Sequence, residues 1–380
     1  MALALAAEQL TSHARDAGAA TPPGIAWLLF AGGAVLLVAA VWPIDRLPIA
    51  DVERYFVGRS ANRRLEHSIA PLLLACLCLV VSMWLFRTVN SVPLGQVPPE
   101  PANSGSWLFW IGALVFFTWA VLAWERAAPP IAGPDQATTL GGRPAARVEV
   151  LIMGGLFVLA LLVRFINLDR VPPGLWFDEA DSGLVAERLS VLVGAHPTFV
   201  AGFSNMGSFY FYLLGLVIKV FGPSIWSLRV LPALSGALLS PLLYLLGSRL
   251  YGWRVGVAAA GMVAISTWNI TFSRIGMNSM PTILLDVAAL FFAVRGLRTG
   301  RLGYFAAGGL MLGLALQIYQ PARLLVFVLL LLLLHLLIST RGRVVRRAGA
   351  GVAVFALATA FAFAPVGGFV LQHPDQFSER

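Results

Sequence analysis

The sequence predicts an all-α polytopic membrane protein, from its hydropathy and from its long apolar segments. Mean hydropathy is +0.81 and 58% of the 380 residues are hydrophobic, a composition that excludes an ordinary soluble domain. Several segments hold roughly 17–22 apolar residues, the length that an α-helix needs to cross a bilayer. We expect spans near residues 25–42, 69–86, 106–124, 147–166, 226–247, 254–272, 280–297, 302–318, 322–340 and 348–371.

The distribution of arginine predicts how these spans are oriented. The net charge of +9 comes almost entirely from arginine, because Lys219 is the only lysine. Membrane orientation explains these arginines better than nucleic-acid binding does, since they fall in the short segments between spans. The segments expected to be cytoplasmic are 43–68, 125–147, 249–254, 295–301 and 341–347. They share one side only if the apolar stretch 207–221 does not cross, so we expect it to be a juxtamembrane helix in an external loop, 167–225.

Two domains are expected. Residues 1–146 form an N-terminal tail with three additional transmembrane helices, and residues 147–380 form a core of seven spans with the external loop. The sequence stops at residues 373–380, soon after the last span emerges on the external side, so we expect a C-terminally truncated chain. Cys76 and Cys78 lie inside one span and indicate neither a disulfide nor a metal site.

The external loop carries an acidic cluster. Asp178, Glu179 and Asp181 fall within four positions, although the whole chain has only 18 acids. Pro172-Pro173-Gly174 forces a non-helical approach, and residues 178–192 then predict an amphipathic helix whose N-terminus favours the Asp178 carboxylate. In one interpretation Asp178 is a general base and Glu179 orients a substrate or a metal. In the other, Asp178 or Asp181 only caps the helix and Glu179 is solvated.

Two further external turns carry polar side chains. Arg274 is predicted at the membrane–water boundary, where a guanidinium can bind a lipid phosphate or simply extend to the interface. The turn 317–323 contains Tyr319, Gln320 and Arg323, which together resemble a rim that binds a sugar or a phosphate. The alternative is that Tyr319 and Arg323 only anchor the helix ends at the interface.

Two polar side chains fall inside predicted spans. Asp286 is expected about two turns below the outer surface, and an acid at such depth is a functional hypothesis by default. It could line the same cavity, but a bond to a neighbouring helix is the favoured interpretation. His335 lies in a leucine run and is expected to be a satisfied core histidine.

The core region also carries short motifs in a defined order. They are Arg164 at the end of the first core span, Pro172-Pro173-Gly174, Phe177-Asp178-Glu179-Ala180, a juxtamembrane helix, Phe221-Gly222, Arg229-Val230-Leu231-Pro232, Ser273-Arg274 and Tyr319-Gln320-Pro321-Ala322-Arg323. In this order and spacing, residues 147–380 resemble integral-membrane glycosyltransferases of the GT-C fold. Within these, the chain is most similar to the protein O-mannosyltransferase and aminoarabinose transferase group, glycosyltransferase family 39.

The resemblance implies a GT-C-like helical bundle with a specific activity. A sugar carried on a polyprenyl or dolichyl phosphate would be transferred, with inversion, to a hydroxyl of a protein, lipid or glycan acceptor at the external face. Asp178 matches the family's catalytic acid in the first external loop. Arg274 and Arg323, with Lys219, are then candidates to stabilise the charge of the leaving phosphate.

The resemblance does not decide whether the protein needs a cofactor. Related oligosaccharyltransferases carry two acids as metal ligands in the second external loop, where this chain has Met277-Asn278-Ser279. No cofactor is therefore certain, and a divalent cation is neither required nor excluded.

Other function classes compete with the enzyme. A transporter or flippase for a lipid-linked or polar substrate should show repeated halves and polar groups near the midplane. The sequence shows no repeat, and its acids are concentrated outside the spans. A catalytically silent membrane scaffold is the third class. We favour the enzyme, with no nucleic-acid partner, and expect it in a bacterial cytoplasmic membrane with its active site facing outside.

Overall fold

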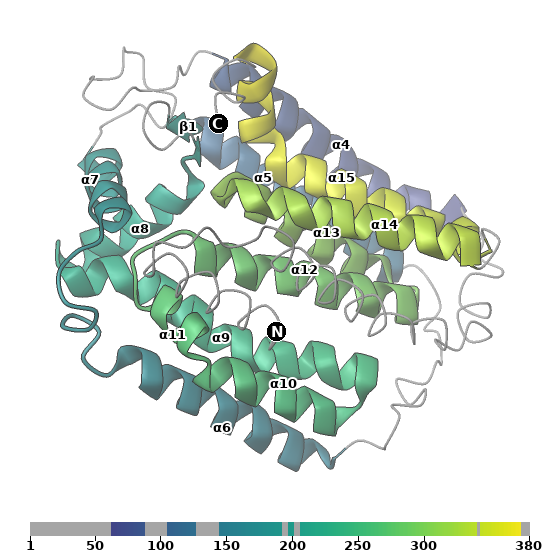
Figure 1. Ribbon diagram of the computed structural model, residues 1–380. Helices are drawn as coiled ribbons and strands as arrows, with labels where there is room; N and C mark the ends of the chain where they lie inside the picture. Colours follow the sequence, from purple (N-terminus) through teal and green to yellow (C-terminus); the bar gives the residue numbers. More distant parts are fainter. Residues whose placement is uncertain are drawn as a thin grey trace, which may run out of the picture. The chain divides into compact units, whose positions relative to one another are not determined.

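The computed structural model describes residues 62–87, 105–126, 144–191, 197–200, 206–339 and 343–373 (Figure 1). All of them belong to one compact unit, residues 52–380. The described residues are helical almost throughout, so the predicted all-α polytopic membrane class is confirmed. The span expected near 25–42 lies outside the described residues.

Each of the other predicted spans corresponds to one helix, except that the span 254–272 is divided between two helices with a bend between them. In chain order the elements are α4 (Asn62–Phe86), α5 (Gly105–Arg126), α6 (Ala146–Phe165), α7 (Phe177–Val191), β1 (Phe199–Val200), β2 (Met206–Gly207), α8 (Phe209–Phe221), α9 (Ile225–Tyr251), α10 (Trp253–Ile265), α11 (Thr267–Ser273), α12 (Ser279–Thr299), α13 (Leu302–Ile318), η2 (Gln320–Ala322), α14 (Arg323–Ser339) and α15 (Arg343–Gln372). Within the described residues, seven helices are long and apolar enough to cross a membrane, or up to eight if the bent pair α10–α11 forms one span.

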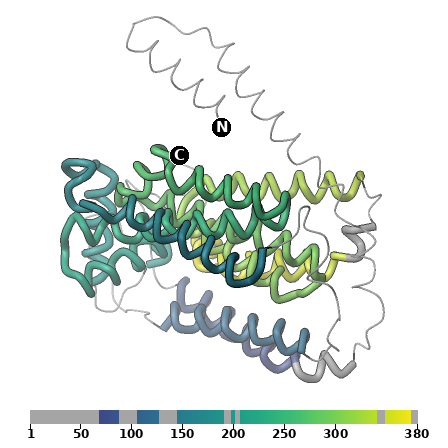
Figure 2. Tube along the Cα trace, turned by 90° about the horizontal axis from the view of Figure 1, so that it is seen from below, coloured from purple at the N-terminus to yellow at the C-terminus, as the bar shows by residue number. Residues whose placement is uncertain are grey.

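The helices pack in a series that can be followed in Figure 1. There α6 lies beside α9 and α10, α9 also contacts α12, and α12 packs on α13. Next, α13 packs on α15, and α14 contacts α15 as well. Figure 2 shows α4 and α5 running side by side, and both of these helices contact α15. The first helices of the described chain are therefore joined to its last helices.

Capping and glycine residues set several helix ends. The Ser224 hydroxyl accepts a hydrogen bond from the Ser227 N–H at 3.1 Å, which is the usual way for a helix such as α9 to begin. Gly300 has φ of 65° and ends α12 in the left-handed conformation that glycine tolerates best. At Ser266 the backbone becomes extended, and α11 leaves α10 at an angle of 57°. This bend directs the chain toward the turn that carries Arg274.

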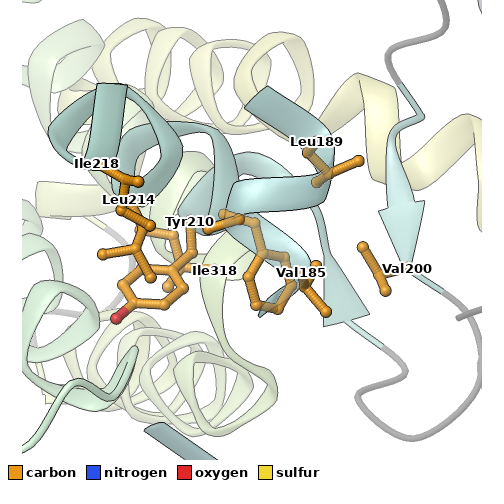
Figure 3. Close-up of a cluster of buried hydrophobic side chains, with 9 residues drawn as sticks. Val185, Leu189, Val200, Tyr210, Leu214, Ile218 and Ile318 are labelled. Atoms are coloured by element: carbon orange, nitrogen blue, oxygen red, sulfur yellow. The ribbon is translucent and has the colours of Figure 1, made fainter. Parts of the chain in front are cut away.

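The two helices predicted in the external loop are both present. The amphipathic helix expected over 178–192 is α7, and the stretch 207–221 forms α8. With 13 residues, α8 is about 20 Å long, which is too short for a hydrocarbon core of about 30 Å. The two helices pack through one apolar cluster, drawn in Figure 3: Val185, Ala186, Leu189, Val200, Tyr210, Phe211, Leu214, Ile218 and Ile318.

A short antiparallel pair, which the sequence did not predict, closes the segment between these helices. Phe199 pairs with Gly207, and Val200 pairs with Met206. Any side chain at position 207 would overlap the carbonyl oxygen of Gln317, so a glycine is needed where β2 crosses the end of α13. The pair therefore fixes the start of α8 against the turn between α13 and α14.

The two polar residues inside spans lie in α12 and α14. The Oδ1 atom of Asp286 is buried without a hydrogen-bond partner in the described part of the chain. The expected bond between Asp286 and a neighbouring helix is thus not formed at this atom. His335 is half-buried in α14.

Candidate functional site

Three turns that the sequence assigns to one face of the membrane meet at one end of the bundle. The first is the segment 166–176 between α6 and α7, the second is the turn 274–278 between α11 and α12, and the third is the turn between α13 and α14. Gly276 of the second turn bonds to the start of α7, and Asn278 Nδ2 donates to the Ile318 carbonyl at 3.3 Å. Residues separated by more than 140 positions thereby form one polar region.

A buried ion pair lies at the centre of this region. Arg229 of α9 and Glu179 of α7 are both 0% exposed. Arg229 donates from Nε to Glu179 Oε1 at 2.7 Å and from Nη2 to Oε2 at 3.1 Å, so the pair is bidentate. Two backbone N–H groups complete the hydrogen bonding of the carboxylate. Gly276 N donates to Oε1 at 2.9 Å, and Trp176 N donates to Oε2 at 3.3 Å. The interpretation in which Glu179 is solvated is therefore wrong.

Arg229 also organises the segment that precedes α7. Its remaining N–H groups donate to three backbone carbonyls: Leu168 at 3.1 Å, Pro172 at 2.9 Å and Gly174 at 2.6 Å. All five guanidinium donors are thus satisfied, which is the condition under which a charged group can be buried at tolerable cost. The sequence marked Arg229 only as part of a motif and assigned it no partner.

Gly276 is required for the bond to Glu179. A Cβ at this position would lie 2.9 Å from Glu179 Cγ and 3.0 Å from the Leu228 carbonyl oxygen. The carbonyl of Gly276 accepts a hydrogen bond from the Tyr210 hydroxyl of α8 at 3.3 Å. Burial, with the nearby Glu179 charge, raises the pKa of Tyr210, so the phenol stays protonated and able to donate.

Asp178 differs from its neighbour in both exposure and bonding. It is half-buried in the first turn of α7, where the helix dipole favours a negative charge. Among the described residues, no group hydrogen-bonds to its carboxylate or forms an ion pair with it. Of the two adjacent acids, Glu179 is therefore saturated and inaccessible, whereas Asp178 remains available to a substrate.

Arg274 is placed as a helix cap. Its guanidinium donates to five backbone carbonyls at and beyond the end of α6, which are those of Val163, Arg164, Ile166, Asn167 and Val171, at distances of 2.7–3.2 Å. Carbonyls at a helix C-terminus lack intrahelical partners, and a guanidinium has just five N–H groups. The prediction that Arg274 binds a lipid phosphate does not fit this geometry, since no donor is left for a phosphate oxygen.

Replacing Arg274 tests this assignment. Both Arg274→Lys and Arg274→Gln should lower the thermal unfolding temperature, because each leaves several carbonyls without a donor, at about 1–3 kcal/mol for every buried group. Arg170→Gln is the control, since Arg170 is exposed. Unfolding is followed in detergent by measuring the fraction of folded protein that remains at each temperature. A lysine variant of unchanged stability but weaker binding of a lipid phosphate would contradict the cap.

Arg164 ties the end of α6 to the bend between α10 and α11. It is fully buried and donates to the Asn269 side-chain oxygen at 2.5 Å and to the Ser273 hydroxyl at 3.2 Å. Its other bonds go to the carbonyls of Ala160, Val263 and Ala264. Arg164, Arg229 and Arg274 are thus three buried arginines that position turns.

The other predicted binding residues lie around this region. Tyr319 is half-buried and packs against the cluster shared by α7 and α8. Gln320 begins η2 and Arg323 begins α14, both partly buried. Lys219 is exposed in the last turn of α8. Their roles toward a substrate remain predictions.

A metal site is not evident from the side chains. Within the part of the chain that the structure describes, no three His, Cys, Asp or Glu side chains come together in a way that could hold a metal ion.

Part of the chain matches a known protein family. Residues 207–367 match the family model described as dolichyl-phosphate-mannose-protein mannosyltransferase, whereas no curated protein and no solved structure matches the chain. The matched segment begins after α7, so it contains Arg229 and Gly276, which hold Glu179, but neither Asp178 nor Glu179 itself. Residues 207–367 are thus similar to a family of mannosyltransferases, and the long apolar helices of the described chain are those of an integral membrane protein.

Proposed function

We propose that the chain transfers a sugar from a polyprenyl-phosphate donor to a hydroxyl acceptor at the external face of the membrane, with inversion and with Asp178 as the general base. One observation carries the assignment of the base. Two adjacent acids occupy the same helix turn, and the bonds made by Arg229, Gly276 and Trp176 saturate only Glu179. The free carboxylate of Asp178 is therefore held in place by a neighbour that cannot move.

The transfer requires one base and one leaving group. The Asp178 carboxylate accepts the proton of the acceptor hydroxyl while the hydroxyl oxygen attacks the anomeric carbon from the side opposite the phosphate. The bond between that carbon and the phosphate oxygen breaks, and its electron pair leaves on the polyprenyl phosphate. One carboxylate is sufficient, since a single displacement inverts the anomeric centre and forms no covalent enzyme intermediate.

Cations near the outer surface would stabilise the leaving phosphate. With Arg274 engaged by five carbonyls, Arg323 and Lys219 are the remaining candidates among the residues singled out above. Tyr319 and Gln320 precede Arg323 and offer a phenol and an amide, groups that bind sugar hydroxyls. The donor's polyprenyl tail would stay in the bilayer beside the helices, so only its head has to reach the polar region.

The test is a transfer assay with the full chain in liposomes. Labelled polyprenyl-phosphate sugars are supplied with candidate protein, lipid and glycan acceptors, and the anomeric configuration of the product is determined by NMR. Transfer with inversion supports the proposal, and a retained configuration contradicts a single displacement. Movement of the labelled lipid across the bilayer without transfer would instead favour the transporter.

The predicted sidedness needs its own measurement. A single cysteine at position 169, in a background in which Cys76 and Cys78 are replaced by serine, should react with a membrane-impermeant maleimide in intact cells. A cysteine at the exposed position 254 should react only after the cells are opened. The reverse pattern would place the site on the cytoplasmic side.

A further inference from the structure

The hairpin of α4 and α5 lies outside the family match but is firmly joined to the matched segment. An apolar cluster connects them: Ala75, Ala113, Phe117, Val121, Ala306, Ala358 and Phe361. Two polar bonds anchor α5 along its length. Trp110 Nε1 donates to the Phe361 carbonyl of α15 at 2.9 Å, and Gly303 N donates to the Glu125 carboxylate at 3.1 Å.

The N-terminal end of α5 also contacts α8 through aromatic rings. Trp107 meets Tyr212 edge-to-face, with ring centroids 5.3 Å apart and planes at 72°. Trp110 meets Phe209 in the same manner, at 6.0 Å and 71°. Aromatic pairs prefer this arrangement, so these contacts favour one orientation of α8 in addition to burying apolar surface. The Tyr212 hydroxyl donates to the Pro197 carbonyl at 2.9 Å, which ties the same ring to the segment before β1.

The opposite side of α8 reaches the acidic pair. Its buried residues pack on α7, the helix whose first turn carries Asp178 (Figure 3). Its Tyr210 hydroxyl bonds to the carbonyl of Gly276, and the N–H of Gly276 bonds to Glu179. A displacement of α8 would therefore shift both α7 and the turn whose Gly276 bonds to Glu179.

We propose that Trp107 and Trp110 are positioning residues for the transfer reaction. They brace α8 against the rest of the bundle and thereby hold α7, with Asp178, in its reactive position. This role rests on the proposed function, because it assigns to α4 and α5 the task of aligning the general base of that reaction. Neither tryptophan would touch the substrate, yet a displacement of a catalytic group by about 1 Å can cost on the order of 10²-fold in rate.

The test compares the Trp107→Ala/Trp110→Ala double variant with Trp119→Ala. Trp119 belongs to the same helix but is 54% exposed, so its loss leaves the contacts with α8 intact. Hydrogen–deuterium exchange of the full chain in liposomes should rise several-fold over α7 and α8 in the double variant, and remain unchanged over α10. The kcat for transfer should fall about 10- to 100-fold, with the KM for the lipid donor within about twofold. The Trp119 variant should match the wild type in all of these measurements.

A conservative variant separates alignment from mere folding. Trp107→Phe/Trp110→Phe keeps an aromatic ring at each contact with α8 and loses only the indole N–H donors, such as the one to the Phe361 carbonyl. It should therefore restore much of the kcat, even if the alanine variant is too unstable to purify. Unchanged exchange over α7 with a wild-type kcat in the alanine variant would overturn the proposal. Loss of exchange protection throughout the chain would also overturn it, since the tryptophans would then be general packing residues. If the wild type transfers no sugar, the proposed function fails, but the exchange measurement still decides whether α5 braces α8.

Discussion

Replacing Asp178 with asparagine is expected to lower the rate of sugar transfer by about 10²- to 10⁴-fold, the usual contribution of a general base. Asparagine has nearly the same shape as aspartate but cannot accept the acceptor's proton. The chain should express and unfold like the wild type, because no described residue bonds to the Asp178 carboxylate. The measurement is the initial rate of transfer from a labelled polyprenyl-phosphate sugar, at equal amounts of membrane-inserted protein.

Asp169→Asn provides the matched control for this variant. Asp169 lies in the segment just before α7 and pairs only loosely with the exposed Arg170, at 3.8 Å. Its replacement should leave the rate within about twofold of the wild type. Equal rates for wild type and Asp178→Asn would remove Asp178 from the mechanism and require another base.

Breaking the buried ion pair should have the largest effect on stability. Arg229→Met leaves the Glu179 carboxylate buried without a counter-charge, a change that typically costs about 3–5 kcal/mol. It also removes the donors to the Leu168, Pro172 and Gly174 carbonyls, so the segment before α7 should lose its conformation. We therefore expect both a lower unfolding temperature and a loss of transfer, read from heating curves and from the transfer assay.

A second pair in the same region serves as the comparison. Asp169→Ala removes an exposed ion pair, for which the expected change is about 0–1 kcal/mol. The double variant Glu179→Leu/Arg229→Met should be more stable than Arg229→Met alone, since no unpaired charge is then buried. It should not regain transfer, because the carbonyls and Gly276 would still lack their partners. If Arg229→Met unfolds like Asp169→Ala, the pair does not stabilise this region as we infer.

The sequence by itself determined where most of the helices of this protein lie. A long apolar run satisfies its backbone groups in a bilayer by forming a helix, so the apolar helices of the described chain could be located from hydropathy. The start of α7 was predicted from the proline- and glycine-rich segment before Asp178 and from the amphipathic pattern that follows it. The distribution of arginine predicted that 207–221 is a helix that does not cross, and this stretch forms α8. These are local properties, and local properties can be read along the chain.

Only the tertiary structure decided what each polar residue does. Asp178 and Glu179 are adjacent acids, and only the structure shows that Arg229, 50 positions beyond Glu179, binds Glu179 and leaves Asp178 without an ion pair. The sequence predicted that Arg274 binds a phosphate, but in the structure its guanidinium donates to carbonyls at the end of α6. The contact between Trp107 and Tyr212 has no sequence signal at all. The reason is physical, because a hydrogen bond or a ring contact depends on distance and angle, and packing between remote helices sets both.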